Sequence, residues 1–87
     1  MELQTLFQQA TINSKTLSEK PDNETLLKLY SLYKQASEGD TQEEGPSNPF
    51  DFVAKFKHDA WAKLKGTSKE DAMKAYINLV NELKSNQ

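Results

Sequence analysis

The stretch Tyr30-Ser-Leu-Tyr-Lys-Gln-Ala-Ser-Glu-Gly39-Asp40 is the most informative part of this sequence for both fold and site. Its two tyrosines and Lys34 stand at positions i, i+3 and i+4, a spacing that gathers side chains on one face of a helix. The same face is largely apolar, where packing alone does not explain a lysine. Aromatic rings beside a cation, at the edge of an apolar surface, suit a ligand that combines a base, phosphates and an aliphatic tail.

The composition narrows the class of protein. A chain of 87 residues is enough for one small domain, and we expect residues 1–87 to form it. Cysteine is absent, which excludes disulfides and thiolate metal sites. Arginine is also absent and the net charge is −2, which argues against nucleic-acid binding. With no signal-peptide pattern and no membrane-length apolar run, we expect a cytoplasmic protein, monomeric and without stable membrane insertion.

Apolar residues recur with a period near 3.6 in four segments, and period-2 alternation does not persist anywhere. We therefore expect an all-α protein with helices at roughly 2–14, 23–38, 51–65 and 67–85. Asp22 and Gly39 are expected to begin and end the second helix, and Thr67-Ser-Lys-Glu70 is a capping-box pattern for the fourth. Residues 40–50 contain two prolines, a glycine and three acids, which predicts a long loop. Such a loop allows the second and third helices to be other than antiparallel neighbours.

Two lysines lie on the apolar sides of their helices. On the second helix the apolar side chains cover roughly 220° of the helical wheel, which is typical of a central helix or of one that lines a pocket. Lys34 lies inside that arc, and Lys57 lies on the apolar side of the third helix. Because a buried charge needs a partner or water, three explanations are open. They are extension of the ammonium group into solvent, a pair with an internal carboxylate such as Asp59 or Asp51, and a bound anion.

Signals of catalysis are weak. His58 is the single histidine, and the sequence has no nucleophile elbow and no glycine-rich phosphate loop. Lys65-Gly-Thr-Ser68 matches the end of a phosphate-binding loop, but the upstream glycine spacing is missing. One imidazole and scattered carboxylates do not make a metal site. We therefore expect a protein that is not an enzyme and that uses no metal or cofactor.

Two runs of residues carry a resemblance to a known family. They are Tyr30 to Asp40, quoted above, and Lys65-Gly-Thr-Ser-Lys-Glu-Asp-Ala-Met-Lys-Ala-Tyr-Ile77. Three shorter matches fall between and before these runs, at the places that the family pattern predicts: Leu17-Ser-Glu-Lys-Pro21, Asp51-Phe52 and Asp59-Ala-Trp61. On these residues the chain resembles the acyl-CoA-binding protein family along essentially its whole length. The resemblance implies a four-helix bundle with up-down-down-up topology. It also implies a non-catalytic intracellular carrier of medium- and long-chain fatty acyl-CoA for transport and pool formation in lipid metabolism.

The resemblance also implies a set of residues that contact the acyl-CoA: Lys15, Leu27, Tyr30, Tyr33, Lys34, Lys57 and Tyr76. Lys57, Tyr30 and Lys34 match the family residues that hold the 3′-phosphate and the adenine-ribose end of CoA. Tyr33, Tyr76 and Lys15 match residues that contact the rest of the head group, and Tyr76 is expected to serve the core as well. The acyl chain is expected in a groove between the second and third helices.

The sequence departs from the family pattern at four places. His58 stands where tryptophan is common, Val53 where lysine is frequent, and Gly45 where arginine is frequent. The loop Ser47-Asn-Pro-Phe50 is about one residue longer than usual. These departures leave the head-group residues intact and bear on chain-length preference. Two other functions remain as alternatives: a helical adaptor that binds a partner helix on the apolar face of the second helix, and an acyl-thioester enzyme relying on His58.

Overall fold

The computed structural model describes residues 2–41, 48 and 50–85, and these residues form four helices and no strand. The helices are α1 (Leu3–Ser14), α2 (Asn23–Glu38), α3 (Phe52–Ala62) and α4 (Lys69–Ser85). The predicted all-α class is therefore confirmed. None of these helices has the length and apolar content needed to cross a membrane.

Aspartates cap the starts of the two middle helices. The Asp22 carboxylate accepts a hydrogen bond of 2.8 Å from the Thr25 N–H, as the sequence predicts for the start of α2. At α3 the Asp51 carboxylate accepts from the Ala54 N–H at 3.1 Å, so the helix begins one residue after the predicted start. Each carboxylate satisfies a backbone donor that has no partner within the helix.

The start of α4 corrects a detail of the predicted capping box. The helix begins at Lys69, and the Ser68 hydroxyl accepts a hydrogen bond of 3.0 Å from the Asp71 N–H. The capping residue is therefore Ser68, one position after the predicted Thr67. Both residues are good caps by type, and the geometry of the preceding turn decides between them.

The end of α3 is a second correction, because this helix stops at Ala62 and not at Lys65. After it the backbone tightens, and the Leu64 N–H donates to the Trp61 carbonyl at 2.9 Å, an i to i+3 bond. Gly66 then takes a φ of +92°, a conformation that residues with a side chain rarely adopt. The chain thus turns sharply into α4.

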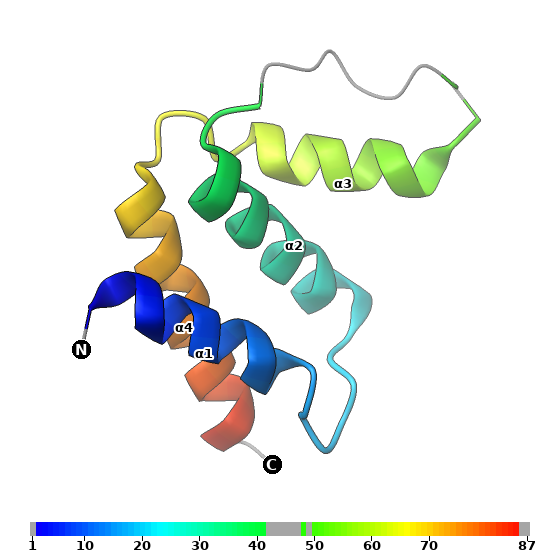
Figure 1. The fold of residues 1–87 in the computed structure, drawn as a ribbon. Coiled ribbons are helices and arrows are strands. Elements are labelled where there is room, and N and C mark those ends of the chain that lie inside the picture. Colours follow the sequence, from blue (N-terminus) through cyan, green and yellow to red (C-terminus); the bar gives the residue numbers. More distant parts are fainter. Residues whose placement is uncertain (1, 42–47, 49, 86–87) are drawn as a thin grey trace.

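The four helices pack unequally. Figure 1 shows α2 and α3 running in one direction and α1 and α4 in the other, which is the predicted up-down-down-up arrangement. In the described part of the chain, α4 packs against α1 and α2, whereas α3 packs against α2 and no other helix. The segment that joins α2 to α3 was predicted to be a long loop, and residues 42–47 and 49 of it lie outside the described residues.

The main hydrophobic core lies between α1, α2 and α4. Its buried members are Phe7, Ala10, Leu29, Leu32, Ala36, Ala72, Tyr76 and Val80. α3 buries Trp61, while the phenylalanines and the valine of its first half remain more than half exposed: Phe52, Val53 and Phe56. The bundle is therefore a packed three-helix unit with α3 held at its edge.

A polar network ties the end of α2 to the turn before α4. The Gln35 side chain is fully buried, and its Nε2 donates to Asp40 Oδ1 and to the Thr67 carbonyl, both at 2.7 Å. The same Asp40 oxygen accepts the Gly66 N–H at 3.0 Å. Buried polar groups need such partners, so the network fixes the position of the turn relative to α2.

The charge on Asp40 should make part of the stability dependent on pH. The hydrogen bonds from Gln35 and Gly66 lower the pKa of Asp40 below its ordinary value of 3.8. A lowered pKa means that the ionised carboxylate stabilises the fold above the unfolded-state pKa, and that this contribution is lost as the pH falls through the folded-state pKa. Asp40→Asn keeps an accepting oxygen but removes the charge, so it should be less stable than the parent at pH 7.

Urea unfolding of both proteins between about pH 7 and pH 2 measures this difference, which should shrink below about pH 4. The matched control is Glu82→Gln, which removes one negative charge from α4 outside the network. If the difference in unfolding free energy between Asp40→Asn and the parent stays constant over the whole pH range, the charge on Asp40 does not contribute to stability.

Candidate functional site

A groove of about 410 Å³ lies between α2 and α3. Its lining residues are Asn23, Leu26, Leu27, Tyr30, Val53, Phe56 and Lys57. Three of the predicted site residues, Leu27, Tyr30 and Lys57, therefore meet in one depression. The lining is mainly apolar with a few polar groups and one cation, which is typical of a small-molecule site.

The two lysines singled out from the helical wheels each lie over an aromatic ring of the neighbouring helix. Lys57 Nζ of α3 lies 5.3 Å from the ring centroid of Tyr30 on α2, and Lys34 Nζ of α2 lies 5.1 Å from that of Trp61 on α3. Both distances are within the range of a cation–π interaction. We call this reciprocal pair of contacts the lysine clasp. A ring is a neutral partner, so it orients an ammonium group without cancelling its charge.

The carboxylate partner of Lys34 was not among those considered from the sequence. Lys34 forms an ion pair with Glu38, one turn later on α2. Of the two candidates named earlier, Asp51 caps α3, and Asp59 lies 3.8 Å from Nδ1 of His58. Lys34 is half-buried and Glu38 is more exposed, with side-chain exposures of 26% and 53%.

Lys57 differs from Lys34 in its surroundings. Its side chain is exposed, and its contact in the described part of the structure is the Tyr30 ring. The ammonium group therefore reaches water, as one of the three explanations from the sequence proposed. It also borders the groove, where an anion can approach it.

Tyr33 and Tyr76 belong to an aromatic cluster on the other side of α2. The Phe7 ring stacks on Tyr33 with centroids 5.9 Å apart and meets Tyr76 nearly edge-on at 5.2 Å. Tyr76 is 4% exposed and its hydroxyl donates to Ser14 Oγ at 3.1 Å, so its core role is clear. Tyr33 is 45% exposed and presents its ring at the surface.

A second groove, of about 400 Å³, was not predicted from the sequence. It lies between α1, α2 and α4, and Phe7, Tyr33, Lys69 and Met73 are among its lining residues. The helical wheel gave no signal for it, because Tyr33 lies near the middle of the apolar arc of α2, where a buried ring is expected. The opposite wall comes from α1 and α4, and only the packing of the bundle reveals it.

Lys15, another predicted site residue, directly follows the last residue of α1. It is exposed. The hydrogen bond between Tyr76 and Ser14 ties this end of α1 to α4, and Lys15 directly follows Ser14 in the chain.

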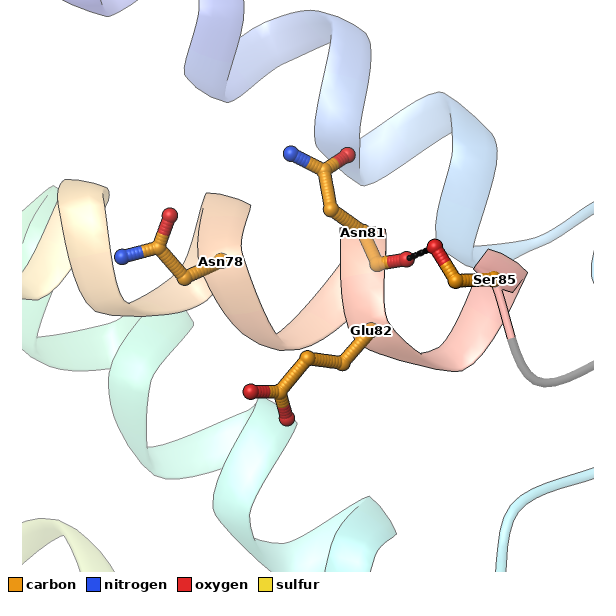
Figure 2. Close-up of a pocket in the computed structure, with 4 residues that line it drawn as sticks. All are labelled: Asn78, Asn81, Glu82 and Ser85. Atoms are coloured by element: carbon orange, nitrogen blue, oxygen red, sulfur yellow. Dashed lines mark hydrogen bonds between the residues drawn. The ribbon is translucent and has the colours of Figure 1, made fainter.

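A further pocket, on the surface of α4, does not suit a phosphate ligand. Figure 2 shows its lining residues Asn78, Asn81, Glu82 and Ser85, with the Ser85 hydroxyl donating to the Asn81 carbonyl at 2.9 Å. Among the described residues, the lining offers amides, a hydroxyl and a carboxylate but no cation. Among the residues that the structure describes, no three histidine, cysteine, aspartate or glutamate side chains are grouped to hold a metal ion.

The fold and the groove together define a small all-α binding protein with lysines and aromatic rings beside an apolar surface. Residues 4–80 match the family model described as acyl CoA binding protein. The chain belongs to the acyl-CoA-binding protein family, whose ligand is acyl-CoA, and the resemblance seen in the sequence is confirmed.

Named relatives and solved structures agree with this assignment. The chain is 47% identical to an acyl-CoA-binding protein homolog of Manduca sexta over 83 residues, which are 95% of this chain and 92% of that protein. It is 45% identical to the acyl-CoA-binding protein of Saccharomyces cerevisiae over 78 residues, 90% of this chain and 88% of the other.

Two crystal structures share the fold. Acyl-CoA-binding protein 2 of Oryza sativa superposes with a TM-score of 0.92 at 39% identity, covering 98% of this chain and 93% of that one. The acyl-CoA-binding protein of Moniliophthora perniciosa gives a TM-score of 0.88 at 32% identity, covering 99% and 83%. The predicted four-helix fold of this family is therefore confirmed.

The hydroxyl of Tyr76 should contribute to stability. Tyr76→Phe keeps the ring but removes the hydrogen bond to Ser14, so we expect the free energy of unfolding to fall by about 0.5–1.5 kcal/mol. Urea unfolding of the variant and the parent measures this loss of stability. Tyr33→Phe is the control, since it removes the hydroxyl from a ring that is 45% exposed. Equal losses in the two variants would mean that the bond to Ser14 adds nothing specific.

Proposed function

We propose that this protein is a non-catalytic carrier of medium- and long-chain fatty acyl-CoA, serving transport and pool formation in lipid metabolism. In this proposal it acts as a cytoplasmic monomer, and residues 1–87 make a single acyl-CoA-binding domain. The observation that carries the proposal is the lysine clasp at the apolar groove between α2 and α3. Lys57 and the Tyr30 ring stand beside the apolar wall of the groove, and Lys34 and Trp61 form a second such contact between the same two helices outside the groove lining. Cations, aromatic rings and an apolar wall match the parts of an acyl-CoA molecule.

The clasp residues hold the nucleotide end of the ligand. Lys57 and Lys34 form charge-assisted hydrogen bonds with the 3′-phosphate, and Tyr30 packs against the adenine and ribose. In the structure described above, Lys57 lies on the Tyr30 ring, so a short movement of a flexible side chain is enough to reach a phosphate at the mouth of the groove. We assign the remainder of the CoA head group to Tyr33 and Lys15, which are exposed, and to the small exposed part of Tyr76, which is 4% exposed.

The acyl chain supplies most of the affinity. Leu26, Leu27, Val53 and Phe56 line the groove and offer the apolar surface that an alkyl chain needs. Burial of a methylene group is worth roughly 0.8 kcal/mol, so ten methylenes give about 8 kcal/mol before ordering costs. An acyl-CoA ester should therefore bind far more tightly than CoA, and a free fatty acid lacks the head group that the lysines recognise.

We propose that the thioester is returned intact. His58 is half-buried, with its Nδ1 3.8 Å from Asp59, and it is not among the residues that line the groove. A general base has to come within hydrogen-bond reach of the group it activates. Incubation with palmitoyl-CoA should therefore release no CoA, and release above the buffer rate would favour the thioester-enzyme alternative.

Calorimetric titration with palmitoyl-CoA tests the carrier proposal, with CoA and palmitate as parallel ligands. We expect one-to-one binding of the ester with a roughly nanomolar dissociation constant, much weaker binding of CoA, and scarcely any of palmitate. Comparable affinity for palmitate and its ester would contradict the head-group mechanism. A folded protein that ignores all three ligands would favour the helical adaptor, which amphipathic peptides would then test.

Lys57→Ala should weaken palmitoyl-CoA binding by about 1.5–3 kcal/mol, because it removes a charge-assisted hydrogen bond. The same change at Lys34 should have a similar effect. The matched control is Lys55→Ala, which removes another exposed lysine of α3 that does not line the groove. The thermal midpoint should stay nearly constant in the Lys57 variant, since its side chain is exposed. An unfolded variant would instead make this lysine structural.

A further inference from the structure

We propose that Glu38 sets the affinity of this protein for the 3′-phosphate, by holding Lys34 until the phosphate displaces it. The inference rests on the proposed function, which assigns Lys34 to the 3′-phosphate of an acyl-CoA. In this role Glu38 is a specificity-determining residue of the binding site, although it does not contact the bound ligand.

Two of the contacts of the Lys34 ammonium group are with partners of different kinds. On one side is the Trp61 ring, with its centroid 5.1 Å away. Trp61 is buried, and its Nε1 donates to the Gly39 carbonyl at 2.9 Å, so the ring has a fixed position. On the other side is the Glu38 carboxylate, whose side chain is 53% exposed and therefore able to turn away.

The two partners respond oppositely to an arriving phosphate. The indole ring is neutral, so it can remain in place while Lys34 binds an anion. The carboxylate of Glu38 carries the same sign of charge as the phosphate and is repelled by it over a few ångströms. When the phosphate binds to Lys34, it therefore replaces the Glu38 carboxylate as the anionic partner of this lysine. Lys57 rests on the Tyr30 ring and has no such carboxylate contact in the described part of the chain.

Glu38 has no evident structural duty that would explain its position. It is the last residue of α2, where the helix dipole disfavours a negative charge. The end of the helix is formed by Gly39, which has a φ of +81° and whose N–H donates to the Gln35 carbonyl at 3.0 Å. Glu38→Gln should therefore leave the thermal midpoint within about 2 °C of the parent.

The test compares two ligands that differ in the 3′-phosphate alone. Glu38→Gln and the parent are titrated with palmitoyl-CoA and with palmitoyl-3′-dephospho-CoA. The variant should bind palmitoyl-CoA about two- to fivefold more tightly, because an exposed ion pair no longer competes, and should bind the dephospho ligand as the parent does. Glu82→Gln is the matched control, since it makes the same change in charge on α4.

A double-mutant cycle supplies the second readout. In the Lys34→Ala background the gain from Glu38→Gln should vanish, because the two side chains act as a pair. The inference is overturned if Glu38→Gln leaves palmitoyl-CoA binding unchanged, if both ligands or the Glu82 control show the same gain, or if the gain persists without Lys34. A parent protein that fails to bind palmitoyl-CoA would overturn the proposed function itself, and this inference with it.

Discussion

The hydrogen bonds of the buried Gln35 amide are the interaction on which the rest of the structure depends. One nitrogen joins Asp40, just after α2, to the Thr67 carbonyl, just before α4. Because α3 packs against no helix other than α2 in the described residues, its C-terminal end needs a separate attachment to the bundle. The network supplies it through Gly66, and the bond from Trp61 to Gly39 adds a second attachment. The spacing of α2 and α3, and with it the groove, follows from these bonds.

The proposed binding site therefore lies at the less tightly packed side of the molecule. The three-helix core buries most of the apolar surface and leaves the phenylalanines of α3 exposed. Elements with few packed neighbours are the ones that open and adjust most easily. If the groove admits a long flexible chain, as we propose, one such wall is an advantage, while the polar network and the lysine clasp hold α3 against α2. The hydrogen bonds of Gln35, Asp40 and Trp61 lie at the end of the helix pair that we propose for the nucleotide, where a defined geometry would help to recognise phosphate.

Much of the fold could be predicted from the sequence, because helix periodicity and capping are local properties. The exceptions are instructive. The apolar pattern of α3 continues to Leu64, but the helix ends at Ala62 because Gly66 turns the chain and bonds to Asp40, a contact between distant residues. The two lysines were recognisable inside apolar arcs, whereas their positions over Trp61 and Tyr30 depend on how two helices pack. The ion pair of Lys34 with Glu38 could have been predicted, since the i, i+4 spacing of the two residues is visible in the sequence.

The contact between Lys34 and Trp61 has a practical consequence. Trp61 is the single tryptophan of the chain, and its indole lies beneath a cation that the proposed ligand engages. A positive charge near an indole ring shifts its emission, so a change in the position or pairing of Lys34 alters the fluorescence of this one residue. The protein thus carries its own optical reporter beside the lysine that we propose binds the nucleotide. Occupancy can be followed there without a label, in real time and at concentrations far below those that calorimetry requires.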